Sequence, residues 1–125
     1  MSAGIAALKQ LTAPGLYERI NKNAERLVAG LRKAIAETNF AAQVNSAYSL
    51  GTIFFTDQPV GNYSDAKRSD TKRYARFFRE MLDRNIFLAP SQFEAAFVSA
   101  AHTTEDIDRT IAAAAEVLQL VAGDN

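Results

Sequence analysis

Glu94 is the first candidate for a chemical role in this chain. It follows Pro90 and Ser91 between two apolar segments, where an unpaired carboxylate would be costly if it were buried. If the turn lined a substrate site, this carboxylate would act electrostatically on charged ligands. From the residues alone, the favoured interpretation is a glutamate that is exposed on a turn.

His102 is the only histidine, and the chain has no cysteine. A pair of histidines, a His–Cys metal set, a disulfide and a thiolate nucleophile are therefore all excluded. Because His102 stands just before a predicted helix start, we expect it to be structural or solvated.

The acidic residues form two groups in which a metal site could be sought. One lies on a predicted loop (Asp57, Asp65 and Asp70) and the other at a predicted helix start (Glu105, Asp106 and Asp108). The loop group lacks the dense alternation and the glycine of a calcium loop. The second group suits the positive end of a helix dipole. Neither group predicts a metal site.

A basic run holds seven of the 14 positive charges, namely Lys67, Arg68, Lys72, Arg73, Arg76, Arg79 and Arg84. On one face of a helix, such a stripe could follow a phosphate backbone. Acidic residues dilute the stripe, and its charged face has no aromatic side chain to stack on a base. A solvated helix face is the favoured interpretation, and nucleic-acid binding through residues 67–84 is a weaker alternative.

The composition predicts one compact domain without a strong overall charge. With 125 residues, the chain can bury a single core. Its 14 basic and 14 acidic residues cancel, so no overall field attracts nucleic acid or an anionic membrane. No apolar run approaches the roughly 20 residues that span a bilayer, and the N-terminus lacks a secretion signal. We therefore expect a cytoplasmic protein.

Helices are predicted towards both ends of the chain. Ala3–Leu11 has helical propensity but no convincing cap, which we interpret as a cut helix. After a break at residues 12–15, with Pro14 expected in the first turn of the next helix, apolar residues recur at the spacing of one helical face. They are Leu16, Ile20, Ala24, Leu27, Leu31 and Ile35. The last helix should begin after a Thr103 cap and bury Ile107, Ile111, Ala114, Leu118 and Val121.

The first part of the middle region has the pattern of short strands. Residues 43–48 and 52–55, joined by a turn at residues 49–51, should pair antiparallel. The polar residues 57–70 predict a surface loop.

The rest of the middle region is predicted to contain a helix and two further short strands. Asp70 should cap a helix with an aromatic inner face. Residues 86–88 and 97–100 are predicted strands on either side of a change of direction at Pro90. The whole pattern indicates an α+β fold with a small, mostly antiparallel sheet that is covered by helices.

Several segments together carry a resemblance to a known family. Ala89–Phe97, with the sequence APSQFEAAF, is similar to the most specific motif of the glutamate-1-semialdehyde aminomutases. Further similar segments are Ser2–Leu8, Gly15–Tyr17, Glu25–Leu27, Asp57–Ala66 and His102–Asp108. These enzymes resemble class III aminotransferases and use pyridoxal phosphate (PLP) on a type I fold.

The resemblance implies that residues 1–125 form a single C-terminal small domain. Residues 1–12 would be a truncated helix that leads from a missing large domain of the same polypeptide. The parent would be a homodimeric, PLP-dependent isomerase that converts glutamate-1-semialdehyde to 5-aminolevulinate for tetrapyrrole synthesis. The alternative is a free-standing α+β binding or regulatory module.

The resemblance also implies how this domain would contribute to the site. Ser91 and Glu94 are the candidates for one wall of the substrate site. No catalytic, cofactor-binding or metal-binding residue is assigned, because none of Lys9, Lys22, Lys33, Lys67 and Lys72 stands in the family's Schiff-base motif. PLP chemistry needs such a lysine, so the chain alone is expected to be inactive and to bind no PLP.

Overall fold

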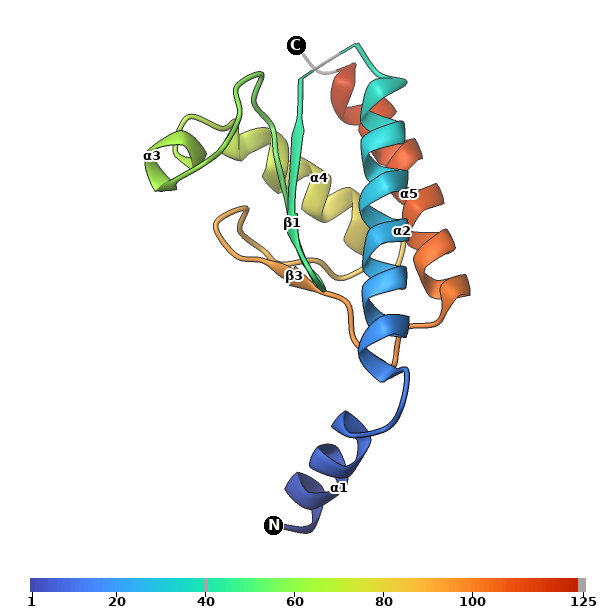
Figure 1. The fold of residues 1–125 in the computed structure, drawn as a ribbon. Coiled ribbons are helices and arrows are strands. Elements are labelled where there is room, and N and C mark those ends of the chain that lie inside the picture. The colour runs from blue at the N-terminus through green and yellow to red at the C-terminus, as the bar shows by residue number, and fades with distance from the viewer. Residues whose placement is uncertain (40, 124–125) are drawn as a thin grey trace.

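The computed structural model describes residues 1–39 and 41–123. Figure 1 shows α2 and α5 side by side, with the sheet and α4 packed beside them and α1 projecting away from the body. The elements are α1 (Ser2–Leu11), α2 (Leu16–Ala36), β1 (Gln43–Ala47), β2 (Leu50–Phe54), α3 (Tyr63–Ala66), α4 (Thr71–Asp83), β3 (Ala96–Phe97) and α5 (Thr104–Ala122). The α+β arrangement predicted from the sequence is confirmed.

The first two helices have the predicted bounds to within a residue, but their junction differs from the prediction. Gly15 is the N-cap of α2, and its φ of 79° is a left-handed conformation that glycine adopts without strain. Pro14 therefore lies before the helix and not in its first turn. As the sequence indicated, no side chain caps α1.

The sheet has the order β1-β2-β3, and both described pairings are antiparallel. The turn between β1 and β2 is shorter than predicted, because Leu50 and Gly51 already pair with Ala47 and Ser46. Only Tyr48 and Ser49 remain in the turn, and Tyr48 accommodates it with a φ of 53°.

The predicted strand at residues 86–88 is wrong. These residues are irregular and pair with no strand of the described sheet, whose order is β1-β2-β3. Ile86 and Leu88 instead pack against the core as partly buried side chains. The predicted strand at 97–100 begins one residue earlier and ends at Phe97.

The predicted loop at residues 57–70 contains the short helix α3, which was not predicted. The Asn62 side chain accepts a hydrogen bond from the Asp65 backbone N–H and caps this helix. Asp70 caps α4 as predicted, since its carboxylate accepts a hydrogen bond from the Arg73 backbone N–H at 3.0 Å.

The larger of two hydrophobic clusters among the described residues joins the sheet to three helices. Its most deeply buried members share near-zero exposure and come from α4 and α5: Phe77, Met81, Ala114, Val117, Leu118 and Val121. Val44 and Ile53 add the inner face of the sheet, and Val28 adds α2. The predicted apolar faces of α2 and α5 therefore both point inwards.

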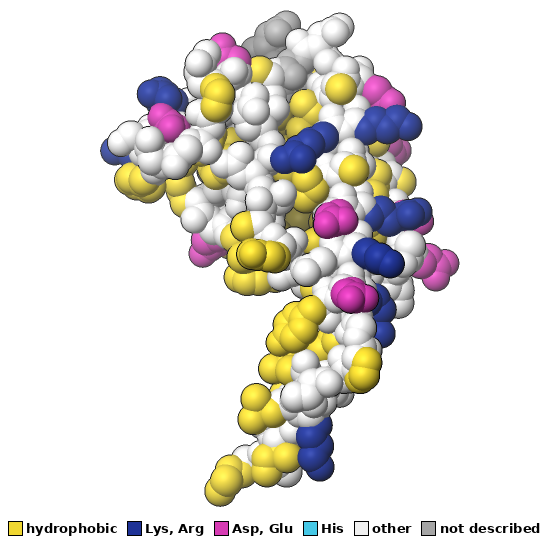
Figure 2. Space-filling model, viewed as in Figure 1, with side chains coloured by type: hydrophobic (Ala, Val, Ile, Leu, Met, Phe, Trp, Pro, Cys, Tyr) yellow, Lys and Arg dark blue, Asp and Glu magenta, His cyan; other side chains and the backbone are white. Residues whose placement is uncertain are grey.

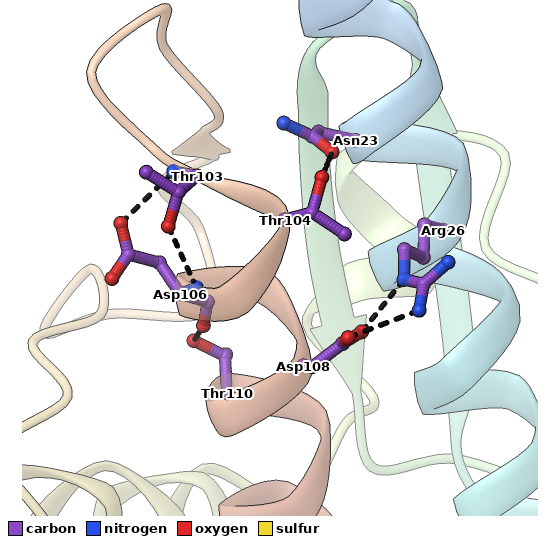
Figure 3. Close-up of polar contacts among 7 residues, drawn as sticks. All are labelled: Asn23, Arg26, Thr103, Thr104, Asp106, Asp108 and Thr110. Carbon is purple, nitrogen blue, oxygen red and sulfur yellow. Dashed lines mark hydrogen bonds and ion pairs between the residues drawn. The ribbon is translucent and has the colours of Figure 1, made fainter.

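A polar clasp fixes α2 against α5 beside this core (Figure 3). The Arg26 guanidinium donates from Nε and Nη2 to the two carboxylate oxygens of Asp108, at 2.6 and 3.0 Å. Thr104 Oγ1 donates to Asn23 Oδ1 at 3.3 Å. The start of α5 has the predicted cap and a complete capping box, in which Thr103 and Asp106 each accept from the other's backbone N–H.

Helix α1 leaves apolar side chains exposed on the surface of the molecule. None of the ten described residues of α1 is buried, and its exposed apolar side chains are Ile5, Leu8 and Leu11. Figure 2 shows hydrophobic side chains along the projecting helix. No helix within residues 1–39 and 41–123 is long and apolar enough to cross a membrane.

Candidate functional site

Ser91 and Glu94 lie on one turn between the irregular segment 86–88 and β3. The Ser91 hydroxyl accepts a hydrogen bond from the Phe93 backbone N–H at 3.2 Å, and the Ser91 carbonyl accepts one from the Glu94 N–H at 3.1 Å. Through these two hydrogen bonds, the half-buried Ser91 organises the turn. The Glu94 side chain is exposed, as predicted from the sequence.

Three elements hold this turn from outside. From α4, the Tyr74 hydroxyl donates to the Ala89 carbonyl at 2.6 Å. From β2, the Thr52 hydroxyl donates to the Glu94 carbonyl at 3.3 Å. From α3, the Tyr63 ring lies 5.7 Å from the ring of Phe93, measured between centroids. The backbone on both sides of Ser91 is therefore fixed by side chains that lie far away in the sequence.

Buried aromatic rings pack around Tyr74, the residue that bonds to the turn from α4. Phe55 makes edge contacts with Tyr74 and with Phe77, at centroid distances of 6.3 and 5.6 Å. Burial raises the pKa of Tyr74 to about 12, and the negative charge of Glu94 adds to this shift. Tyr74 therefore remains a neutral donor at physiological pH, and the carboxylate of Glu94 lies close enough to influence it electrostatically.

A cavity of about 570 Å³ lies beside Glu94. Its walls come from α2, α4, the β1–β2 hairpin, residues 85–89, β3 and the start of α5. Glu94 and Tyr74 line the cavity, but Ser91 does not. The structure thus places the two predicted site residues, Ser91 and Glu94, on one turn, but only Glu94 lines the cavity.

His102 has the structural role that the sequence favoured. Its Nδ1 accepts a hydrogen bond from the Ser99 backbone N–H at 2.9 Å, and its carbonyl accepts one from Asn23 Nδ2 at 3.3 Å. Among the residues that the structure describes, no three His, Asp or Glu side chains come together as a metal site requires.

Four arginines of the basic run form ion pairs with acids. Arg68 contacts Asp65 at 2.5 Å, and Arg84 contacts Glu80 at 3.0 Å and Glu116 at 3.3 Å. Longer contacts join Arg73 to Asp70 and Arg76 to Glu80. Such partly screened pairs are typical of a solvated surface, and this supports the favoured interpretation over a phosphate-binding stripe.

Sequence reasoning missed the residues that hold the turn. Tyr74 was predicted only as part of an apolar face, and neither Thr52 nor Tyr63 was singled out. Gln92, at the centre of the turn, was also missed, although its side chain is among the most deeply buried of the described residues. The one available signal was the position of Gln92 inside the Ala89–Phe97 motif.

The chain is similar in sequence to known aminomutases. The chain is 49% identical over 121 residues to the glutamate-1-semialdehyde 2,1-aminomutase of Roseiflexus castenholzii, which covers 97% of this chain and 28% of that protein. The aminomutase of Desulfitobacterium hafniense is 49% identical over 119 residues, again covering 28% of its length. No protein-family model matches the chain.

Solved structures share the fold. An omega-transaminase from Sphaerobacter thermophilus superposes with a TM-score of 0.85 at 24% identity, covering 97% of this chain and 27% of that one. A glutamate-1-semialdehyde aminomutase from Pseudomonas aeruginosa has a TM-score of 0.76 at 18% identity, with 87% and 24% covered. At these identities, the likeness concerns the fold alone.

The resemblance inferred from the sequence is confirmed by these relatives. The matched part is the C-terminal portion of the aminomutases. The chain spans a little over a quarter of the length of the curated relatives it matches.

Proposed function

We propose that this chain is the C-terminal domain of a PLP-dependent aminomutase that converts glutamate-1-semialdehyde to 5-aminolevulinate. The observation that carries the proposal is the 49% identity to such aminomutases over 97% of the chain. The reaction moves an amino group within one molecule, and its product is a precursor of tetrapyrroles. The resemblance further supports a cytoplasmic homodimer as the complete enzyme.

The residues of this chain do not by themselves fit PLP. All five lysines, each within the described part of the chain, are exposed. None of them is among the described residues that line the cavity beside Glu94. A PLP enzyme needs a lysine that can form a Schiff base next to the substrate. We therefore assign the cofactor to the rest of the longer polypeptide.

The position of that remaining polypeptide is part of the proposal. Helix α1 is only ten residues long and has an exposed apolar stripe at Ile5, Leu8 and Leu11. A helix of this length is only marginally stable in water without packing partners. We therefore place the large domain against α1 and regard residues 1–12 as the connection to it.

Within this enzyme, Glu94 acts as a charge filter on the substrate wall. Aminotransferases of this fold hold the α-carboxylate of an amino acid with a positive group, whereas glutamate-1-semialdehyde has an aldehyde at that end. An exposed carboxylate repels a ligand carboxylate by roughly 1 to 4 kcal/mol at a few ångströms in a partly solvated site. Glu94 therefore favours the aldehyde, and the half-buried Ser91 holds the turn that carries it.

A chimeric enzyme tests the proposed function. The matched part of the Roseiflexus castenholzii aminomutase is replaced by this chain, and formation of 5-aminolevulinate is measured. We expect an active enzyme. The control carries the matched part of the Sphaerobacter thermophilus omega-transaminase and should form little product. A chimera that folds and binds PLP but forms no 5-aminolevulinate would contradict the proposal.

The role of Glu94 is tested in the same chimera. Glu94→Gln should raise the rate of the half-reaction with α-amino acids relative to that with glutamate-1-semialdehyde, because the repelling charge is gone. Single-turnover absorbance changes of the cofactor give both rates. The matched control is Glu105→Gln, an exposed acid on α5 that does not line the cavity. An equal rate ratio in the Glu94 variant and in the control would remove Glu94 from the site.

A further inference from the structure

Gln92 occupies an unusual position in the turn between Ser91 and Glu94. Its side chain is only 2% exposed, although Phe93 and Glu94 directly after it are exposed. Among the described residues, neither its amide nitrogen Nε2 nor its oxygen Oε1 has a hydrogen-bond partner. Buried polar groups in proteins are nearly always paired, so this amide requires a specific explanation.

Packing inside this chain does not explain the glutamine. Methionine has a similar length and shape without polar atoms, and replacing an unpaired buried amide by an apolar side chain of that shape is neutral or stabilising. Other polar groups of the turn do have partners, since the Ala89, Ser91 and Glu94 carbonyls all accept hydrogen bonds. Among the buried side chains of this turn that the structure describes, the missing partners therefore concern Gln92 alone.

We infer that Gln92 is a positioning residue for the Glu94 carboxylate, an inference that rests on the proposed function. The exposed ring of Phe93 is where the rest of the longer polypeptide packs on the turn, which leaves the Glu94 carboxylate facing the substrate. This packing shifts the turn slightly and gives the Gln92 amide its hydrogen-bond partners. The paired amide then holds the turn, and with it the Glu94 carboxylate, at a fixed distance from the substrate.

A double-mutant cycle in the chimeric enzyme tests this inference. Gln92→Met, Glu94→Gln and the double variant are compared by their single-turnover rates with glutamate-1-semialdehyde and with glutamate. Gln92→Met should lower the preference for the semialdehyde about tenfold, because a misplaced group loses much of its effect. The double variant should be no less selective than Glu94→Gln alone, since both changes remove one function. Additive losses, or an unchanged preference in Gln92→Met, would overturn the inference.

The chain by itself supplies the second measurement. There, Gln92→Met should raise the melting temperature, whereas Gln58→Met, at an exposed loop position, should leave it unchanged. A lower melting temperature would show that the amide is already paired within this chain and would overturn the inference. If the unsubstituted chimera is inactive, the proposed function fails, and this inference fails with it. If that chimera is active, the cycle decides on Gln92 alone.

Discussion

The α2–α5 pair and the turn at residues 89–94 are built in different ways. The two helices bury side chains such as Val117 and Leu118 completely, and they pair the charges of Arg26 and Asp108 with each other. The turn is held by single contacts from three elements and encloses the unpaired amide of Gln92. The polar groups of the α2–α5 clasp are thus paired with each other, whereas the turn keeps a buried amide without a partner among the described residues.

The largest expected effect lies in the helix pair. Leu118→Ala removes a fully buried side chain and should lower the free energy of unfolding by about 2–5 kcal/mol. Leu8→Ala, on the exposed face of α1, should change it by less than about 0.5 kcal/mol. Urea denaturation of the chain measures both. Equal losses in the two variants would contradict the view that stability resides in the α2–α5 layer.

A close approach between the same helices should give the next largest effect. A Cβ atom at Gly30 of α2 would lie 2.6–2.8 Å from three side-chain carbons of Ile111 on α5. Gly30→Ala should therefore destabilise the chain by about 1–3 kcal/mol despite the better helix propensity of alanine. Gly4→Ala is the matched control, since a Cβ there meets nothing within 4 Å.

Combining Gly30→Ala with Ile111→Ala tests the cause of that loss. The second change makes room for the new methyl group, so the two effects should be smaller together than their sum. Purely additive losses in thermal unfolding would show that Ile111 is not the obstacle.

A substitution that removes a contact to the turn at residues 89–94 should destabilise the chain less than the substitutions in the helix pair. Tyr74→Phe removes the hydroxyl that donates to the Ala89 carbonyl, and we expect a loss of about 1–2 kcal/mol in the free energy of unfolding. Tyr48→Phe, at a tyrosine that is 85% exposed, serves as the control and should have almost no effect. Should Tyr74→Phe prove as stable as the control, the contact from α4 would not hold the turn.

The smallest effect concerns the exposed ion pair of the clasp. A hydrogen bond from Arg26 is the main reason why the pKa of Asp108 is lowered from its ordinary value of 3.8. Because the folded-state pKa is the lower one, the pair contributes stability above about pH 4, and this contribution is lost as the pH falls through the folded-state pKa. Asp108→Asn should flatten the acid side of the stability profile, measured by thermal unfolding between pH 2 and pH 6. Asp57→Asn, on the exposed loop, should leave the profile unchanged.

The sequence predicted most of the helical structure because its signals are local. The periodic apolar residues of α2 and α5 and the caps at Asp70 and Thr103 each depend on a few neighbouring residues. The strand at 86–88 could not be excluded in this way, because strand pairing depends on which distant segments the fold brings next to it. The same non-local dependence explains why β3 is shorter than predicted.

The candidate site was predictable only in part. Glu94 was correctly expected to be exposed, but the contacts of its turn with Thr52 and Tyr74 depend on the path of the whole chain. Gln92 could not be recognised as buried, since a polar residue in a turn is usually exposed. The roles of Ser91 and Glu94 at a substrate wall stay predictions until the chimeric enzyme is measured.

The packing of α2 on α5 also sets when the domain can fold during synthesis. Arg26 and Asp108 are separated by 82 positions, and the core side chains of α5 come still later. At about 5–20 residues per second, α2 is therefore synthesised roughly 4–16 s before its partner helix. During that interval the apolar face of α2 has no cover from α5. The nascent α2 therefore stays without its main packing partner until α5 emerges, however stable the finished domain is.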